Sequence, residues 1–346
     1  MVSFPDQDFS QLNIYLDELK PSKLFILVDE NTHEHCLPTL LGNMETSLPF
    51  EILEIEPGEE MKTLTTAAHL WEILAGFEAD RNALLINLGG GVITDLGGFV
   101  ASTYKRGIKF INMPTTLLAM CDASIGGKTG IDHQFIKNII GTFAAADHVF
   151  VYPEFLKSLP FEELRSGFAE MLKHGLIADE KHWEDLIELR DLEAGPLFPY
   201  IKRSMEIKLE IVEQDFREQN IRKTLNFGHT VGHAIESIHL ESGKPILHGE
   251  AVAAGMICET WLAANEKLIA TEEAKRIVEN IRRFFPPIDL SAFAGKDLVG
   301  LMKKDKKNSG SRINFALPEK IGSARYDVHI SEENIYHALH YYQKLT

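Results

Sequence analysis

The first half of the chain alternates short apolar runs with segments of helical periodicity, and this alternation constrains the fold more than any other feature. Residues 24–28, 83–88, 109–113 and 148–152 are continuous apolar or β-branched runs with the length of buried strands. Helix-like stretches such as residues 65–77 lie between them. Such alternation is typical of βαβ units, and it predicts a parallel sheet with helices on both faces.

The second half changes character after Pro160, where the hydrophobic pattern takes a period of 3.6 residues. The segments predicted to be helical are residues 161–178, 198–214, 231–238, 251–264 and 271–285. Breaks are predicted at Gly195-Pro196, Gly243 and Pro286-Pro287. A chain of 346 residues is long for one core. We therefore predict an α/β domain with a parallel, Rossmann-like sheet over residues 1–157, and a mostly α-helical domain over residues 158–346.

Charge and cysteine content limit the partners of the chain. The 35 basic and 51 acidic side chains give a net charge of -16, which argues against a nucleic acid or an anionic membrane surface as a partner. From the sequence we predict neither a signal peptide nor a membrane-spanning segment. Cys36, Cys121 and Cys258 lack C-x-x-C spacing, so neither a disulfide framework nor a thiolate zinc site is predicted. We expect a cytoplasmic protein in which an anionic substrate requires a local cationic pocket.

Three histidines, His229, His233 and His248, lie in a short stretch that predicts a metal site. In N-F-G-H-T-V-G-H the first two are four residues apart, so on a helix both project from one face, and a turn after the helix can return His248 to that face. Zinc favours such a cluster, while Gly228 and Gly232 leave room for a close approach. The zinc-protease signature H-E-x-x-H is absent. Because a catalytic zinc usually has three protein ligands, we expect that one histidine is not a ligand, and the spacing does not tell which.

Two glycine-rich turns are candidates for phosphate binding. G-G-G-V-I-T-D, from Gly89 to Asp95, runs from a buried strand into a helix, where backbone amides and the helix N-terminus can hold a pyrophosphate. The alternative is a turn that only connects the strand to the helix, since the usual G-x-G-x-x-G pattern is missing. D-A-S-I-G-G-K-T-G, from Asp122 to Gly130, carries Lys128 but lacks the spacing of a nucleotide triphosphatase loop. Its alternative is a tight turn with a solvated lysine.

Glu170 and Lys173 lie one helical turn apart in A-E-M-L-K-H-G. Such a pair is usually a surface ion pair worth about 0.2–0.5 kcal/mol. Phe168, Met171 and Leu172 surround these two residues with apolar side chains. We therefore keep two interpretations, a solvated pair and a pair of which at least one member points inward.

Taken together, these segments resemble the 3-dehydroquinate synthase family, the sugar phosphate cyclases of the shikimate pathway, from about residue 24 to residue 322. The motifs occur in the family's order: G-G-G-V-x-x-D, Y-x-R-G-I, P-T-T-L-L-A, D-A-S-I-G-G-K-T-G, K-N-x-I-G, A-E-M-L-K-H-G, L-N-F-G-H-T-x-G-H and H-G-E-A-V. Thr94 and Asn220 stand where the family often has glycine, and we expect Asn220, which tolerates a left-handed conformation, to preserve the backbone. The resemblance implies a dehydroquinate synthase-like fold.

The resemblance also implies two cofactors, NAD and a zinc ion that Co²⁺ can replace. Zinc is expected at Glu170, His229 and His248, which leaves His233 as an acid/base group. NAD is expected between the domains, in contact with Asp29, Asn31, Glu59, Lys62, Gly90, Gly91, Val92, Asp95, Thr115, Thr116, Lys128, Lys137, Phe155 and Ser158. The substrate is expected at a mostly cationic set that suits a phosphorylated keto acid: Arg106, Asp122, Lys128, Lys173, Lys208, Arg222, Asn226, and Lys306 or Lys307.

The activity implied by the resemblance is the conversion of 3-deoxy-D-arabino-heptulosonate 7-phosphate into 3-dehydroquinate and phosphate, by a homodimer. NAD is expected to act as a catalyst, oxidising the substrate before phosphate leaves and reducing it again before an intramolecular aldol step closes the ring. Three alternatives stay open. The first is another sugar phosphate cyclase, acting on glucose 6-phosphate or sedoheptulose 7-phosphate. The second is a metal-dependent polyol dehydrogenase, which would accumulate NADH. The third is a dinucleotide-binding protein without catalytic activity.

Overall fold

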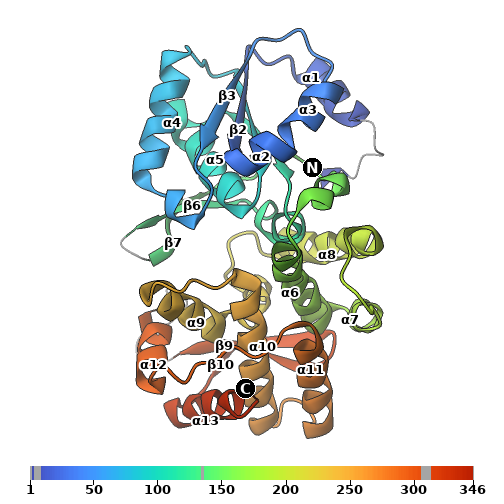
Figure 1. The fold of residues 1–346 in the computed structure, drawn as a ribbon, viewed down its shortest axis with the longest axis vertical. Helices are drawn as coiled ribbons and strands as arrows, with labels where there is room; N and C mark the ends of the chain where they lie inside the picture. Colours follow the sequence, from blue (N-terminus) through green and yellow to red (C-terminus); the bar gives the residue numbers. More distant parts are fainter. Residues whose placement is uncertain (1, 4–8, 134–135, 305–312, 346) are drawn as a thin grey trace. The chain divides into compact units, whose positions relative to one another are not determined.

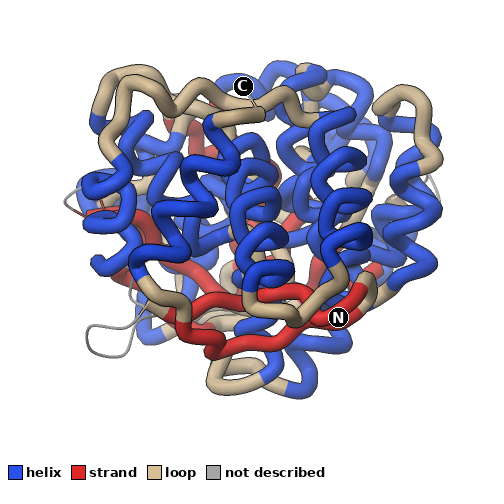
Figure 2. Tube along the Cα trace, turned by 90° about the horizontal axis from the view of Figure 1, so that it is seen from below, coloured by secondary structure: helices blue, strands red, loops and turns tan. Residues whose placement is uncertain are grey.

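The computed structural model describes residues 2–3, 9–133, 136–304 and 313–345, and the chain divides into two compact units (Figure 1). Unit 1 comprises residues 1–160 and 193–205, and unit 2 comprises residues 161–192 and 206–346. Figure 2 shows the strands in red among more extensive helices. In the part of the chain that the structure describes, no helix combines the length and the apolar character needed to cross a membrane. The three cysteines are buried free thiols.

Unit 1 is built on a six-stranded sheet whose neighbouring strands are all parallel, in the order β1-β8-β5-β4-β2-β3. The strands are β1 (Val2–Ser3), β2 (Leu24–Asp29), β3 (Phe50–Ile55), β4 (Leu84–Gly89), β5 (Lys109–Pro114) and β8 (His148–Phe150). The residues of β4 are all buried, as expected for an apolar strand covered on both faces. The predicted parallel sheet is therefore confirmed, and β2, β4, β5 and β8 match the four predicted runs to within two residues.

Helices and turns of unit 1 connect these strands. They are α1 (Ser10–Leu19), α2 (Glu30–His35), α3 (Leu37–Asn43), α4 (Leu64–Gly76), α5 (Gly91–Thr103), η1 (Glu59–Met61), η2 (Tyr104–Arg106), η3 (Ala119–Ala123) and η4 (Pro153–Ser158). Figure 1 shows α4 on one side of β2 and β3, and α1 to α3 on the other. Gly97 lets α5 approach the sheet closely, because a Cβ there would lie 1.9 Å from Oδ1 of Asn87 on β4. A separate antiparallel hairpin, β6 (Lys128–His133) with β7 (Ile136–Phe143), completes the unit.

Unit 2 is mostly helical, as predicted. Its helices are α6 (Phe161–Ala178), α7 (Glu180–Ile187), α9 (His229–Glu241), α10 (His248–Asn265), α11 (Thr271–Phe284), α12 (Gly295–Lys304) and α13 (Glu332–Gln343), and α8 (Ala194–Gln214) contributes its residues from 206 onward. A 3₁₀ turn, η5 (Ile221–Asn226), and an antiparallel hairpin of β9 (Asn314–Lys320) and β10 (Ser323–His329) complete it. Almost all of α10 is buried, in contact with α6, α9, α11 and α13. This helix is the centre of the unit.

Candidate metal centre and cofactor site

Glu170, His229 and His248 come together in unit 2. Nε2 of His229 and Nε2 of His248 lie 3.5 Å and 3.7 Å from Oε1 of Glu170, and one donor atom from each residue lies within 4.8 Å of the other two. Glu170 is buried in the middle of α6, while His229 and His248 are the first residues of α9 and α10. Two imidazole nitrogens and one carboxylate oxygen are a donor set that suits a catalytic zinc with an open position. The residues therefore fit the expected ion.

The two imidazoles are oriented by acceptors on their other nitrogen. Nδ1 of His229 lies 3.1 Å from the carbonyl oxygen of Phe227, and Nδ1 of His248 lies 3.3 Å from Oε2 of Glu236. Donation from Nδ1 directs Nε2 toward Glu170, the orientation that metal-binding histidines have. Burial acts to lower the pKa of His248, but the carboxylates of Glu236 and Glu170 outweigh it and raise that pKa to about 10. The surroundings of the donors thus favour positive charge.

His233 lies beside this cluster on the face of α9 that also carries His229. Its ring centroid is 5.1 Å from that of His229 and 5.9 Å from that of His248. A second group of donors, His233, Glu236 and His248, also has its atoms within 4.8 Å of one another. The structure therefore brings all three predicted histidines together and offers two overlapping donor sets. Glu236 was not predicted from the sequence, although its position three residues after His233 on one helix is a signal that marks it.

Close backbone contacts hold together the three helices that carry the candidate ligands. The N–H of Gly249 donates to Oγ of Ser166 at 3.0 Å, which fixes the start of α10 one turn away from Glu170 on α6. Between α9 and α10, a Cβ on Gly255 would lie 1.8 Å from the carbonyl oxygen of Gly228. A Cβ on Gly232 would lie 2.9 Å from the carbonyl oxygen of Ala251. The close approach that Gly228 and Gly232 predict is therefore present.

We expect Gly255→Ala to lower the free energy of unfolding by about 1–3 kcal/mol, because the new methyl group must displace the carbonyl of Gly228 and overpacks the contact. Gly300→Ala in α12 is the matched control. Nothing lies within 4 Å of a Cβ at Gly300, so the free energy of unfolding of this variant should rise by about 0.4–1 kcal/mol. Urea unfolding followed by circular dichroism measures both changes. A Gly255→Ala protein as stable as the wild type would contradict the backbone contact of α9 and α10.

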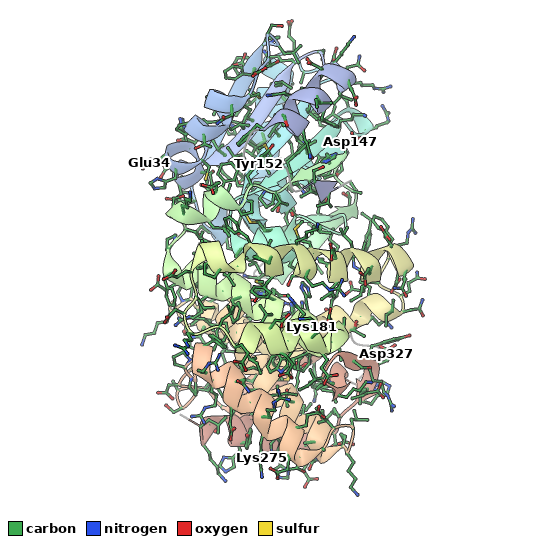
Figure 3. The ribbon with its side chains drawn as sticks, turned by 90° about the vertical axis from the view of Figure 1, so that its right-hand side faces the viewer. Glu34, Asp147, Tyr152, Lys181, Lys275 and Asp327 are labelled. Carbon is green, nitrogen blue, oxygen red and sulfur yellow. The ribbon has the colours of Figure 1, made fainter. Side chains whose placement is uncertain are left out.

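Glu170 divides its two carboxylate oxygens between different partners. Oε1 faces the histidines, whereas Oε2 forms an ion pair with Nζ of Lys173. Both side chains are 1% exposed, so the inward-pointing interpretation of this pair is correct. The pair of Lys275 and Glu272 on α11 is instead exposed to solvent, and Figure 3 shows Lys275 at the surface of the molecule. Lys173 therefore brings a buried positive charge directly to the group of candidate metal donors.

The segment before α9 holds two more predicted substrate residues, Arg222 and Asn226, on η5. The guanidinium of Arg222 is buried and its Nη1 donates to the carbonyl oxygen of Phe216 at 2.6 Å. Nδ2 of Asn226 donates to Oε1 of Glu218 at 2.8 Å. Burial acts to raise the pKa of Asp215, but that pKa lies below its usual range because the carboxylate accepts three backbone N–H groups, those of Gln219, Asn220 and Arg222. Lys208 is buried on α8 in the same unit.

In unit 1, predicted NAD contacts follow the carboxyl ends of the parallel strands, where such sheets bind ligands. Gly90 caps α5 and Gly91 begins it, and the cap makes no side-chain hydrogen bond, so the backbone N–H groups of the first turn, which includes Val92, can face an anion. The N–H of Thr115 donates to the carbonyl oxygen of Gly89 at 3.1 Å, joining the ends of β4 and β5. A Cβ on Gly90 would lie 3.0 Å from Cγ2 of Thr116. These residues fit the expected pyrophosphate.

Four other predicted NAD contacts form one ionic network around Lys62. Its buried Nζ lies 2.6 Å from Oδ2 of Asp95 and 3.8 Å from Oε1 of Glu59, and Nζ of Lys137 lies 3.5 Å from the same Glu59 oxygen. Burial acts to lower the pKa of Lys62, but Asp95, Glu59 and Asp132 outweigh it, so this pKa is raised. Lys62 is therefore a fixed positive charge beside the start of α5.

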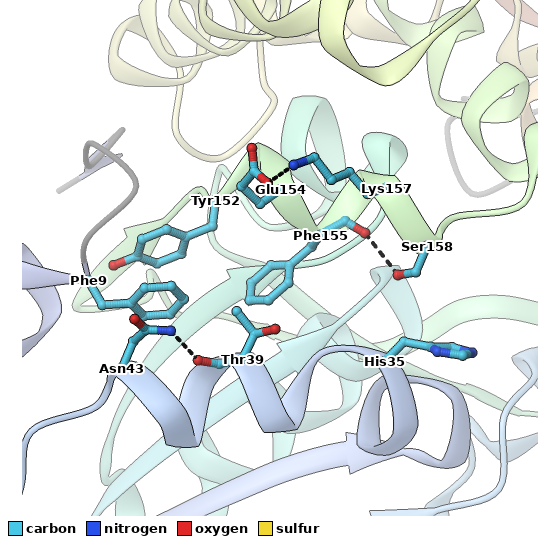
Figure 4. A pocket seen from close by; sticks show the side chains of 9 residues that line it. All are labelled: Phe9, His35, Thr39, Asn43, Tyr152, Glu154, Phe155, Lys157 and Ser158. Atoms are coloured by element: carbon cyan, nitrogen blue, oxygen red, sulfur yellow. Dashed lines mark hydrogen bonds and ion pairs between the residues drawn. The ribbon is translucent and has the colours of Figure 1, made fainter.

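Asp29 ends β2, and Asn31 follows it in α2. Asp29 caps α2 by accepting the N–H of Thr32 at 2.8 Å, and Asn31 lies in the first turn of that helix. Phe155 and Ser158, on η4 after β8, line one cavity of about 420 Å³ (Figure 4). The other lining residues of this cavity are Phe9, His35, Thr39, Asn43, Tyr152, Glu154 and Lys157.

The remaining predicted substrate residues of unit 1 lie on three different elements. Arg106 ends η2 just before the amino end of β5, whereas Thr115 follows the carboxyl end of that strand. Asp122 lies in η3, and Lys128 begins β6 after the turn formed by Gly126 and Gly127, both with positive φ. Lys306 and Lys307 lie outside the described residues.

Sequence comparisons match both parts of the chain to one family. Profiles described as the N-terminal and C-terminal parts of 3-dehydroquinate synthase match residues 52–166 and 167–308. The chain is 41% identical over 337 residues to a 3-dehydroquinate synthase from Parabacteroides distasonis, a match that covers 97% of this chain and 95% of that protein. It is 39% identical over 342 residues to a 3-dehydroquinate synthase from Campylobacter jejuni subsp. jejuni, covering 95% and 96%.

Among solved structures with a similar fold, two hold NAD⁺ and a divalent metal ion. A 2-epi-5-epi-valiolone synthase from Streptomyces hygroscopicus subsp. jinggangensis, with NAD⁺ and Zn²⁺ bound, has a TM-score of 0.87 and 26% identity, with 100% of this chain and 96% of that chain covered. A 2-deoxy-scyllo-inosose synthase with carbaglucose-6-phosphate, NAD⁺ and Co²⁺ has a TM-score of 0.86 and 22% identity, covering 99% and 96%. A probable glycerol dehydrogenase from Sinorhizobium meliloti has a TM-score of 0.67 and 16% identity, covering 99% and 96%. The last two likenesses show a shared fold alone.

Proposed function

Because the chain belongs to the 3-dehydroquinate synthase family, we propose that it converts 3-deoxy-D-arabino-heptulosonate 7-phosphate into 3-dehydroquinate and phosphate. The observation that carries this proposal is the cluster of buried Glu170 and His229 with half-buried His248, and with His233 beside it, in a chain that matches both parts of the family. A binding protein without catalytic activity has no need of such a donor set with an open position.

Two cofactors belong to this proposal, NAD and Zn²⁺, with Co²⁺ as a possible substitute. Glu170, His229 and His248 would hold the metal, and the start of α5 together with the network around Lys62 would hold the dinucleotide. When bound, the metal supplies Lewis-acid polarisation of a substrate hydroxyl, and NAD supplies a hydride acceptor that returns the hydride later. The choice of donors supports this assignment, because imidazole and carboxylate are ligands that zinc accepts.

The chain's own residues bind the substrate and move its protons. Lys173, Lys208 and Arg222 are buried cations suited to the phosphate and the carboxylate of one anionic substrate. His233, whose imidazole lies within reach of the cluster, is proposed to exchange a proton with the reacting substrate. The others of the substrate set are proposed to orient the substrate: Arg106, Asp122, Lys128, Asn226, and Lys306 or Lys307.

We expect phosphate release from the heptulosonate phosphate with only trace NAD, because the hydride that leaves the substrate returns to it within one turnover. Phosphate is measured colorimetrically and NADH by absorbance at the same time. The matched control is the same protein stripped of metal with a chelator. Absence of phosphate above this control, with folded protein, contradicts the proposal. One NADH for each product molecule would instead identify a dehydrogenase, and faster release from glucose 6-phosphate or sedoheptulose 7-phosphate would identify another cyclase.

A cytoplasmic homodimer completes the proposal. Its support is the family resemblance, together with three free buried thiols that suit a reducing compartment. Light scattering during size-exclusion chromatography measures the mass in solution, which should be twice that of one 38.9 kDa chain.

A further inference from the structure

Glu259 is a fully buried carboxylate of unit 2 that no motif marks. Its Oε2 accepts the N–H of Gly228 at 2.6 Å, and its Oε1 accepts the N–H of Val231 at 3.0 Å. Both groups belong to the start of α9, where the first backbone N–H groups have no partner within the helix. The cap residue Gly228 has no side chain with which to accept them, and its φ of +80° favours glycine. Glu259, from the neighbouring helix, takes the place of the missing cap.

The position of Glu259 on α10 links this cap to the metal cluster. It lies eleven residues after His248, which is close to three helical turns, so both residues lie on one face of α10. His229 lies between the two residues whose N–H groups Glu259 accepts. One carboxylate therefore ties the turn that presents His229 to the helix that presents His248.

The contact between α9 and α10 makes this tie sensitive to geometry. Their backbones approach so closely at Gly255 and Gly228 that no side chain fits between them. Hydrogen bonds to a charged acceptor are stronger and shorter than neutral ones, and a negative charge at a helix N-terminus is favourable. The same contact sets the position of His233, one turn further along α9.

We propose that Glu259 is a positioning residue for the metal centre, which holds His229 and His233 in place relative to His248 through the first turn of α9. The inference rests on the metal ligands proposed above. Glu259 is not a member of the donor groups that contain His229 or His248, and its two oxygens accept backbone N–H groups of α9 instead. Glu259 therefore acts on the position and direction of His229 and His233 relative to His248.

The test is the zinc affinity of Glu259→Gln, measured by chelator competition on purified, metal-stripped protein. The amide retains one acceptor oxygen but presents an NH₂ group to the second N–H. We expect zinc to bind about 10- to 100-fold more weakly, the usual effect of removing a group that orients a ligand. The visible spectrum of the Co²⁺-loaded variant should change as well, since it reports the arrangement of ligands. Excess zinc should restore part of the activity, which loss of folding would not allow.

Glu259→Asp and Asp179→Asn are the companion variants. Glu259→Asp keeps the charge but shortens its reach, and we expect an intermediate zinc affinity. Asp179 caps α7 of the same unit by accepting the N–H of His182 at 3.0 Å. Asp179→Asn makes the same change from carboxylate to amide at a helix cap outside the donor groups, and it should keep the wild-type zinc affinity.

Two outcomes overturn the inference. One is a folded Glu259→Gln protein with wild-type zinc affinity and an unchanged cobalt spectrum. If the glutamine variant does not fold, the same result in folded Glu259→Asp overturns the inference. The other is an equal loss of zinc affinity in Asp179→Asn, which would make the effect one of general stability. A wild-type protein that binds no zinc contradicts the proposed function instead, so the two failures are distinguishable.

Discussion

His229→Ala is expected to lose bound zinc and activity together, whereas His233→Ala should keep about one zinc per chain and lose about 10²- to 10⁴-fold in rate. In the first variant only Glu170 and His248 remain of the usual three protein donors. In the second variant the donor set is intact, and the loss is the usual contribution of a positioned proton-transfer group. Elemental analysis of both purified variants, together with phosphate-release rates, measures these outcomes.

The structure also indicates what the opposite result would mean. His233 forms its own donor group with Glu236 and His248, so a metal could bind there without His229. If His233→Ala is the variant that loses zinc while His229→Ala retains it, the ligand assignment is wrong and this second group holds the metal. Glu236→Gln is then the decisive further variant, because it removes a donor from the second group only.

Arg222→Lys is expected to lower kcat/KM for phosphate release by about 10- to 100-fold, equivalent to roughly 1.5–3 kcal/mol for one hydrogen bond to a charged group. The guanidinium of Arg222 donates from Nη1 to the carbonyl oxygen of Phe216 and still has other N–H groups for an anion. A lysine ammonium cannot reproduce that planar fork.

Arg217→Lys is the matched control for this change, because Arg217 is an exposed arginine in the same segment. We expect it to stay within about twofold of the wild type, as surface substitutions usually do. Circular dichroism verifies that both variants fold. Near-wild-type activity of Arg222→Lys would place Arg222 outside the substrate site.

How much of the fold the sequence predicts depends on how far each element is buried. Continuous apolar runs such as β4 are unambiguous, because a strand covered on both faces has no polar side to dilute the pattern. The edge strand β3 was not predicted, since glutamates interrupt its apolar residues and Phe50 and Ile52 are exposed. The hairpins β6–β7 and β9–β10 were also missed, because β7 and β10 leave much of their surface in water, although the interior of β9 is buried.

Local backbone chemistry differs from expectation at two positions. Gly195-Pro196 does not break the chain, because α8 begins at Ala194 and Pro196 lies in its first turn, where its missing N–H has no partner to lose. Asn220 does not occupy the left-handed region, since its φ is -135°. Its N–H instead donates to Oδ2 of Asp215 at 2.6 Å, a contact between side chain and backbone that no sequence pattern announces.

The candidate metal donors could be named from the sequence because recognisable motifs carry them, although their roles stay predictions. The groups that orient these donors could not be named from the sequence. Glu236 acts on His248 across two helices, and Glu259 acts on the backbone of α9, so their identity follows from packing alone. Asparagine or glutamine at position 259 would leave the hydrophobic pattern of α10 unchanged.

The central place of α10 also links the cluster to folding. Its three donors lie far apart in the sequence and meet only when α6, α9 and α10 have packed, so an unfolded chain holds no preformed site. An ion that binds only the packed form shifts the folding equilibrium of the helical unit by mass action, by about 2.7 kcal/mol when its free concentration is 100 times its dissociation constant. Metal supply in the cell thus becomes a determinant of how long this chain persists as well as of how fast it works.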